Sequence, residues 1–427
     1  MLTRSEFMVL LGALGTAGAP AVAHAAQPPW YPMPPPLPLG KGRALVVSGA
    51  GARGSYEAGA IKWLFRNVSA GQPFDLICGT SAGAINAAFA AQGTVESIQR
   101  NEQLWKGMPS AGILTLQPQI QDVVDGAKQL QESAKHGYPA KLRYIGRAKN
   151  EFQKAGPPAD LIKLMGVMDD AGIETLVHRY PLELSSLQSS LFVTATNVTN
   201  MTSDSFYQFV GPTAASSEAR FLERTTTRRE MLTSEGTPPL TVQHNSHHAL
   251  TQDNFSDAVV ASAAMPGVFQ PVAIKRRETG DANMYVDGGV ANNTPVELAI
   301  DAGATDITVI LATALGELPA QPTTLPGMLQ AVNAIMQQRI LQNDVTLAVA
   351  KNLLARHHDW SGLNPAMQAF LESLRDGEWT PIKLRVIRPR KPLKLSVLGF
   401  NDQAGIDAAF DIGYQDAQHE WVYSAAG

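Results

Sequence analysis

The sequence predicts an α/β protein with a mostly parallel sheet, because short apolar strands alternate with helices joined by glycine-containing turns. The first two strands are each followed directly by a helical segment, which is the βα order that parallel sheets require. Two β-branched runs further along the chain add strands to the same sheet. The expected strands are 44–47, 74–78, 191–196 and 307–311, and the expected helices are 56–65 and 82–91.

The second of these strand-to-helix turns carries a serine between two glycines, in the sequence Gly79-Thr80-Ser81-Ala82-Gly83. Glycines lack the Cβ that would clash in a sharp turn, so the Ser81 hydroxyl can project from it as a nucleophile. The start of the following helix places free N–H groups beside that oxygen. The alternative is a glycine-rich turn in which Ser81 only caps the helix.

The first turn, between the strand at 44–47 and the next helix, is rich in small residues that leave backbone N–H groups exposed. Such groups can bind the negative charge that develops on an oxygen during acyl transfer. The same loop matches the G-x-G-x-x-G pattern of dinucleotide sites. That pattern expects an acidic residue at the end of the second strand, and Asp75 instead opens a strand. The loop residues in question are Gly49, Ala50, Gly51, Arg53 and Gly54.

A third segment, Asp287-Gly288-Gly289, follows a short strand at 283–286 and precedes a helix that Pro295 could begin. Asp287 would therefore lie where a strand ends, which is where functional groups gather in open α/β sheets. Taken alone, Asp-Gly is most often an ordinary turn.

Together, the glycine-rich loop, the G-x-S-x-G turn and the late D-G-G segment occur in the order found in the patatin-like phospholipase family, and the chain resembles that family. The segments 258–272 and 294–299 are also similar to it. The resemblance covers residues 43–311, with less similar stretches at 108–180 and 211–256. It implies a three-layer fold with a central, mostly parallel sheet, helices on both faces and a helical insertion.

The resemblance also implies a Ser–Asp dyad, with Ser81 as the nucleophile and Asp287 as the general base. N–H groups around Gly49, Ala50 and Gly51 would hold the oxyanion, and Arg53 would order the loop or contact an acidic head group. The reaction would be phospholipase A-type hydrolysis through an acyl-serine intermediate, at a membrane surface and without a cofactor or metal. The family usually has glycine where this chain has Ala50, whose methyl group narrows the loop and disfavours positive φ.

Three other functions remain open from the sequence. A neutral-lipid lipase or a transacylase would use the same two residues. A catalytically silent lipid-binding protein would retain the fold without the reaction. A nucleotide-binding protein is suggested only by the G-x-G-x-x-G match.

The composition of the chain limits the kinds of molecule that the protein is expected to bind. The net charge is −4, so nothing predicts nucleic-acid binding.

Cys78 is the only cysteine, which excludes an internal disulfide, and it is expected to be a buried apolar residue. His244, His247 and His248 form the densest histidine cluster, but their spacing fits no structural zinc site, and we expect a solvated loop.

The chain is expected to divide into an export signal, a proline-rich linker, a catalytic domain and a C-terminal extension that packs on it. An apolar stretch with a small-x-small cleavage site predicts a cleaved signal peptide and export to the periplasm or medium; the alternative is an N-terminal membrane anchor. The boundaries are 1–25 for the signal, 26–40 for the linker, 41–311 for the catalytic domain with its helical insertion at 108–180, and 312–427 for the extension.

Outside the motifs, three segments carry weaker expectations. Residues 211–239 are polar and are expected to form a mobile surface loop, in which 225–229 could contact phosphate. Residues 383–390 predict a basic strand that could face anionic lipid or serve as a charged edge strand. Long helices are expected at 325–355 and 402–423.

Overall fold

The computed structural model describes residues 42–68, 73–111, 179–180, 182–234, 245–275, 282–315, 317 and 382–426. The expected signal peptide and linker, nearly all of the helical insertion and the helix at 325–355 lie outside these residues. The division of the chain at residues 40 and 311 stays a prediction.

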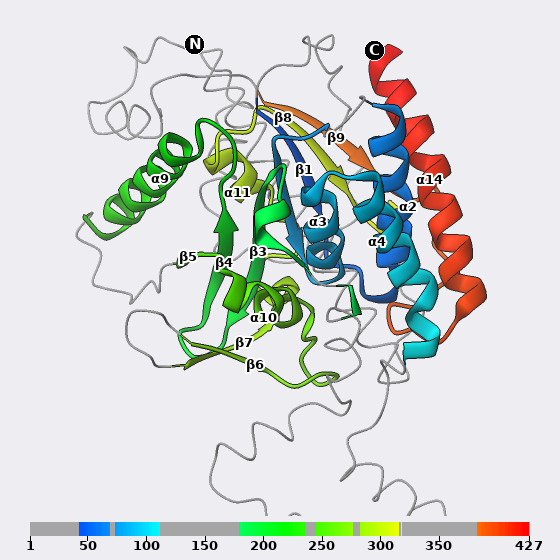
Figure 1. Ribbon diagram of the computed structural model, residues 1–427, viewed down its shortest axis with the longest axis horizontal. Helices are drawn as coiled ribbons and strands as arrows, with labels where there is room; N and C mark the ends of the chain where they lie inside the picture. The colour runs from blue at the N-terminus through cyan, green and yellow to red at the C-terminus, as the bar shows by residue number, and fades with distance from the viewer. Residues whose placement is uncertain are drawn as a thin grey trace, which may run out of the picture.

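The centre of the protein is one mixed, mostly parallel sheet, with the strand order β5-β4-β3-β2-β1-β8-β9 and with β6 and β7 off this path (Figure 1). β1, β2, β3, β8 and β9 run parallel to one another, whereas β4 and β7 pair antiparallel with β3. The strands of the main path are β1 (Arg43–Val47), β2 (Leu76–Thr80), β3 (Ser190–Asn197), β4 (Thr202–Gln208), β5 (His247–Ala249), β8 (Asp306–Ile310) and β9 (Lys383–Ile387). The α/β class expected from the sequence is confirmed.

Two strands meet end to end along one edge of β3. β2 pairs with the first part of β3 up to Thr80 opposite Thr194. β7 (Ala282–Asp287), which also pairs with β6 (Val272–Lys275), runs the other way and ends with Asp287 opposite Ala195. The carboxyl ends of β2 and β7 therefore meet at neighbouring positions of β3, and this brings together segments that are 206 residues apart.

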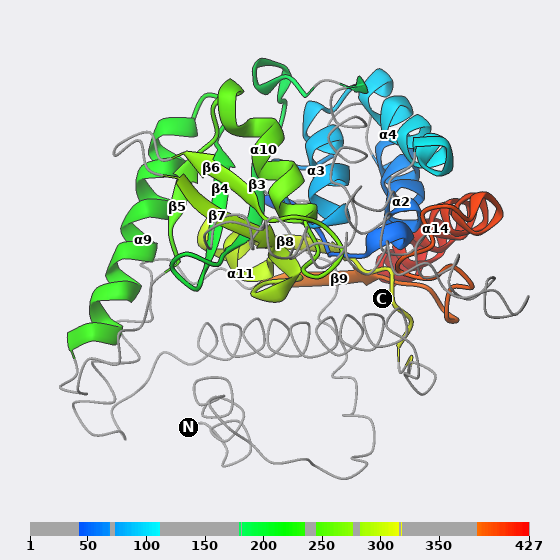
Figure 2. The same cartoon turned by 90° about the horizontal axis from the view of Figure 1, so that it is seen from below.

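Helices cover both faces of the sheet, as Figure 2 shows. Alternate strand residues face two separate apolar clusters, which is the period-2 pattern of a sheet buried on both sides. One cluster is covered by α2 (Gly54–Asn67), α3 (Ala82–Gln92), α4 (Val95–Gly107), α10 (Gln252–Ala263) and α14 (Gln403–Ala426). The other is covered by α9 (Ala214–Ser234) and α11 (Val296–Asp301).

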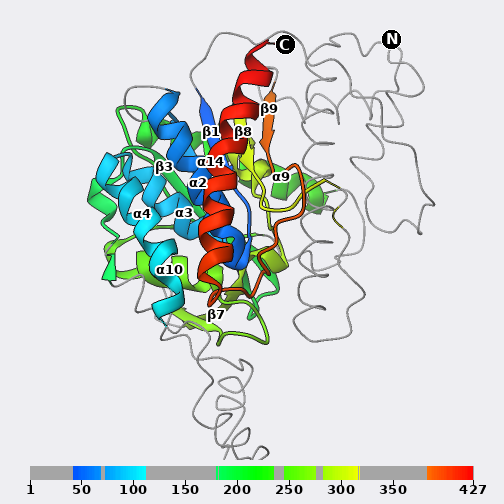
Figure 3. The same ribbon diagram turned by 90° about the vertical axis from the view of Figure 1, so that its right-hand side faces the viewer.

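The C-terminal helix α14 packs along α2, beside β9 (Figure 3). The two helices approach closely because each offers a glycine at the crossing. A Cβ added to Gly413 would lie 1.9 Å from the carbonyl oxygen of Tyr56, and one added to Gly59 would lie 1.9 Å from that of Phe410. This contact explains the glycine within the last predicted helix, and it fixes the C-terminal helix to the helix that follows the glycine-rich loop.

The expectation of a surface loop at 211–239 is wrong, because residues 214–234 form α9. Phe221 is fully buried against Phe192, Tyr207 and Phe209, and these aromatic contacts fix the segment as a helix on the sheet. The polar residues that suggested a loop include Arg and Glu, which are good helix formers. Tertiary packing and helix propensity therefore outweigh the polar composition.

Candidate active site

Ser81 occupies the sharp turn between β2 and α3, as the sequence predicts. Its backbone has φ 56° and ψ −129°, which is a strained conformation for a residue other than glycine. A Cβ on Gly79 would lie 2.4 Å from the carbonyl oxygen of Gly83, and one on Gly83 would lie 2.3 Å from that of Ser48. The turn can therefore form only with glycine at both flanking positions.

Asp287, the last residue of β7, lies against Ser81. The Ser81 Oγ donates a hydrogen bond of 2.6 Å to the Asp287 Oδ2, and both residues are 5% exposed. The other carboxylate oxygen accepts the N–H of Gly289 at 2.7 Å. Burial raises the pKa of Asp287 to about 6, against the lowering effect of its hydrogen bonds from Ser81 and Gly289. A carboxylate with this pKa is ionised at neutral pH and is a better proton acceptor than an exposed aspartate.

Behind the turn, the buried hydroxyl of Ser262 links three elements. It accepts the backbone N–H of Ser81 at 2.8 Å and donates to the carbonyl oxygen of Thr194 at 2.6 Å. Ser262 lies near the end of α10 and is fully buried. The sequence places it within a family-like segment, but nothing in the sequence indicates that it contacts the nucleophile.

The glycine-rich loop lies beside Ser81 and leaves two backbone donors available. The Gly49 N–H is bound to the carbonyl oxygen of Asn293 at 3.0 Å, and the Ala52 N–H is bound to that of Val397 at 2.8 Å. Among the described residues, no hydrogen bond engages the N–H groups of Ala50 and Gly51. Of the three expected oxyanion donors, the N–H of Gly49 is therefore already hydrogen-bonded within the protein.

Residues 50 and 51 have the backbone conformations that their side chains allow. Ala50 has a φ of −142°, so its methyl group causes no backbone strain. Gly51 has a φ of 56°, and a Cβ there would lie 2.4 Å from the carbonyl oxygen of Val397. The concern that alanine at position 50 disfavours a positive φ does not apply to this loop.

Arg53 ties the loop to distant parts of the chain. Its Nε donates to the carbonyl oxygen of Leu395 at 2.7 Å, and its Nη2 lies 3.0 Å from the Glu317 Oε1. Glu317 in turn accepts the N–H of Ala314 at 3.1 Å. Because the guanidinium group is only 4% exposed, this geometry favours loop ordering over contact with a lipid head group.

A buried polar network beneath the loop was not expected from the sequence. The Glu57 carboxyl accepts hydrogen bonds from Ser48 and Asn86, and the Asn86 side-chain oxygen accepts the indole N–H of Trp105 at 2.7 Å. Burial raises the pKa of Glu57, although the hydrogen bonds from Asn86 and Ser48 oppose this.

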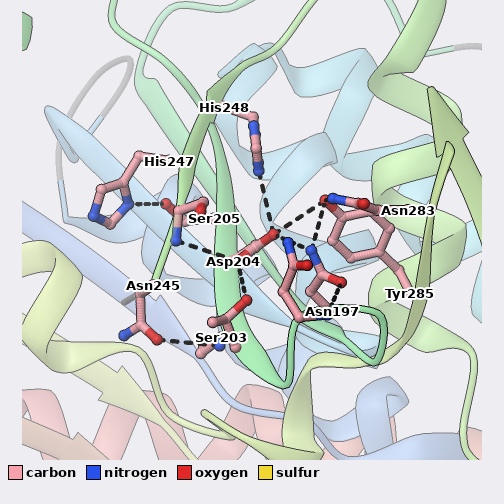
Figure 4. Close-up of polar contacts among 12 residues, drawn as sticks. Asn197, Ser203, Asp204, Ser205, Asn245, His247, His248, Asn283 and Tyr285 are labelled. Carbon is pink, nitrogen blue, oxygen red and sulfur yellow. Dashed lines mark hydrogen bonds and ion pairs between the residues drawn. The ribbon is translucent and has the colours of Figure 1, made fainter. Parts of the chain in front are cut away.

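The histidines expected in a solvated loop instead belong in part to the sheet. His247 and His248 begin β5, while His244 lies outside the described residues. The His248 Nε2 lies 3.2 Å from the Asp204 Oδ2, and Ser205 Oγ lies 2.7 Å from the His247 Nδ1 (Figure 4). The sequence lacked this signal because β5 is only three residues long and depends on its pairing with β4.

Asp204 is the centre of this second polar cluster. It also accepts hydrogen bonds from Asn197 and Tyr285 (Figure 4). A further hydrogen bond comes from the Thr202 hydroxyl. Burial alone would raise its pKa, but the hydrogen bonds from His248, Asn197 and Thr202 lower it overall. The cluster joins β3, β4, β5 and β7, and it lies at the same level of the sheet as Asp287, because Asp204 and Asp287 both pair with Ala195 of β3. Within the described residues, no group of three or more His, Cys, Asp and Glu side chains is arranged to hold a metal ion.

A mostly parallel sheet with helices on both faces and a serine at a strained strand-to-helix turn is the architecture typical of α/β serine hydrolases. The family model for patatin-like phospholipase matches residues 45–300, well over half of the chain, so the chain belongs to the patatin-like phospholipase family. In general terms this makes it a lipid hydrolase. No curated protein matches the sequence.

Two solved structures are similar to the chain at low identity. VipD from Legionella pneumophila is 15% identical, with 90% of this chain and 67% of that chain covered and a TM-score of 0.37. Human GIVD cytosolic phospholipase A2 is 11% identical, with 100% and 67% covered and a TM-score of 0.31. Among the described residues, no helix has both the length and the apolar character needed to cross a bilayer.

Proposed function

We propose that the protein hydrolyses fatty-acyl esters of phospholipids, with Ser81 as the nucleophile and Asp287 as the general base. The observation that carries this proposal is the 2.6 Å hydrogen bond from the Ser81 hydroxyl to a buried carboxylate. A serine hydroxyl is a weak nucleophile unless an adjacent base takes its proton as it attacks. Asp287 is in place to do this without a histidine.

In the first half of the reaction, the Ser81 Oγ attacks the ester carbonyl carbon and its proton passes to Asp287. Collapse of the tetrahedral intermediate breaks the ester bond, and the leaving lysophospholipid oxygen takes the proton from Asp287. In the second half, Asp287 takes a proton from water, which attacks the acyl-serine. The fatty acid leaves, and the proton returns to the Ser81 oxygen.

The negative charge on the tetrahedral intermediate would be held by the N–H groups of Ala50 and Gly51. These donors have no other partner among the described residues, and they lie in the loop next to Ser81. Donors that are fixed before the reaction stabilise the transition state without reorganisation. The Arg53–Glu317 ion pair supports this function by holding the loop in place.

The substrate places the reaction at a lipid surface, and we propose that the protein meets it after export. The proposal of export rests on the apolar, small-residue N-terminal stretch and its cleavage pattern. Secretion or periplasmic retention would follow cleavage, whereas an uncleaved stretch would act as an anchor.

The test is release of fatty acid from mixed phospholipid vesicles by the purified chain, with Ser81→Ala and Asp287→Asn beside it. Labelling by a fluorophosphonate, which requires an activated serine, is measured on the same samples. We expect release and labelling in the wild-type protein, and loss of both in each variant while the circular dichroism spectrum is retained. Release by either variant at the wild-type rate would contradict the dyad. Labelling of Ser81 without release would point to an acyl ester other than a phospholipid.

A further inference from the structure

The two residues of the dyad belong to strands that do not pair with each other. β2 and β7 both pair with β3, and their ends only meet along its edge. The distance between Ser81 and Asp287 therefore depends on how the two strand ends are held. A 1 Å displacement of reacting groups can lower the rate by about 100-fold.

The end of α10 contacts both strand ends. Ser262 accepts the Ser81 N–H at 2.8 Å, and the carbonyl oxygen of Ala264 accepts the Asp287 N–H at 2.8 Å. Ser262 also donates to Thr194 of β3, the strand that both ends share. Figure 2 shows α10 lying over this part of the sheet, next to α3. One helix end thus bonds to the backbone of the nucleophile, the base and the strand between them.

The hydroxyl of Ser262 is suited to this position because it both accepts and donates a hydrogen bond. It is fully buried, and so is Thr194, whose carbonyl oxygen it binds. The amide that it holds belongs to a residue with a φ of 56°, a conformation that persists only when surrounding contacts determine it. Removing the hydroxyl leaves the Ser81 N–H and the Thr194 carbonyl oxygen without this partner.

We propose that Ser262 is a positioning residue for the reaction, which holds the backbone of Ser81 so that its hydroxyl stays aligned with Asp287. The inference rests on the proposed function of Ser81 and Asp287. In this proposal, α10 fixes the distance and orientation between Ser81 and Asp287, whose strands do not pair with each other.

The test compares Ser262→Ala with Ser256→Ala in the full chain. Ser256 lies on the same helix and is partly exposed, so it is a matched control for the loss of a hydroxyl. Hydrogen–deuterium exchange of the Ser81 amide is the first readout, since it does not depend on activity. We expect the Ser81 amide to exchange about tenfold faster in Ser262→Ala, because one hydrogen bond of about 1.4 kcal/mol corresponds to that factor. Ser256→Ala should exchange as the wild-type protein does.

The second readout is the rate of ester hydrolysis. In Ser262→Ala, kcat should fall by about 100-fold with KM unchanged, because the substrate still binds while the nucleophile is misplaced. Ser256→Ala should stay within about twofold of the wild-type rate. Ser262→Cys retains a weak donor and acceptor of similar size and should give an intermediate kcat; it also serves as the test variant if Ser262→Ala does not fold.

The outcomes separate this inference from the proposed function. Unchanged exchange of the Ser81 amide in Ser262→Ala would overturn the positioning role, whatever the activity. A fall in kcat matched by a rise in KM and a lower melting temperature would also overturn it, because that pattern indicates general loosening. If the wild-type protein shows no Ser81 labelling and no ester hydrolysis, the proposed function fails, and the effect of Ser262 on kcat is overturned with it, while the exchange readout still reports whether Ser262 holds the Ser81 amide.

Discussion

Replacing Asp287 with asparagine should stabilise the folded protein more at pH 8 than at pH 4. Burial raises the pKa of Asp287 from 3.8 to about 6, so the folded state binds the proton more tightly than the unfolded state does. Stability from this group is present below pH 3.8 and is lost as the pH rises through about 6, because the ionised carboxylate is disfavoured in the buried site. Asparagine has no charge and does not follow this dependence.

The magnitude follows from the size of the pKa shift. About two pKa units correspond to about 3 kcal/mol at 1.36 kcal/mol per unit. At pH 4 the unfolded aspartate is already partly ionised, so about 2 kcal/mol of this develops between pH 4 and pH 8. The free energy of unfolding of Asp287→Asn, minus that of the wild-type protein, should therefore rise by about 2 kcal/mol over this interval.

Urea unfolding at several pH values measures this difference directly, since the midpoint and slope give the free energy of unfolding for each protein. Asp411→Asn is the control, because Asp411 is exposed on α14. This variant controls for the loss of one carboxylate at a site that is not buried. If the Asp287→Asn difference is constant from pH 4 to pH 8, burial does not shift the pKa of Asp287, and the reasoning is wrong.

Three further predictions concern the same loop, dyad and core. The ester hydrolysis rate kcat/KM should fall about tenfold per pH unit below about pH 6 and level off above it, because Asp287 must be ionised to accept a proton; a flat pH–rate profile between pH 4 and pH 8 would contradict this. Ala50→Gly should keep kcat/KM within about twofold of wild type, since the φ of −142° suits both residues; a gain of tenfold would mean that the methyl group limits the reaction. Gly413→Ala should lower the free energy of unfolding by about 2 kcal/mol, because its Cβ would lie 1.9 Å from the Tyr56 carbonyl oxygen. This loss outweighs the better helix propensity of alanine. If urea unfolding shows a stabilised variant, the two helices can move apart without loss of stability.

The sequence was informative where local chemistry decides the structure. Ser81 and Asp287 could be singled out because each comes at the end of a short apolar strand and has glycines within two residues, and the positions of such turns depend on the local chain. The structure brings these two residues together. Their catalytic roles stay predictions until activity is measured.

Other features depend on contacts between distant segments and left no signal in the sequence. Ser262 and Asn293 matter through hydrogen bonds to residues 181 and 244 positions away. Glu57 lies in the helix expected at 56–65, where nothing in the sequence indicates that it is fully buried with partners on the loop and on α3. The segment at 214–234 was misjudged because one buried aromatic residue, Phe221, outweighs its polar composition.

The most direct test of the central claim is to trap the acyl-enzyme. The purified protein is mixed with a slowly hydrolysed acyl ester, and the reaction is quenched in acid during turnover. The protein is then digested, and the mass of the peptide containing Ser81 is measured by mass spectrometry. Our account predicts an added mass equal to the acyl group on Ser81 in the wild-type protein, and none in Asp287→Asn at the same time of mixing. Acylation of a different residue, or equal acylation of Ser81 without Asp287, would contradict it.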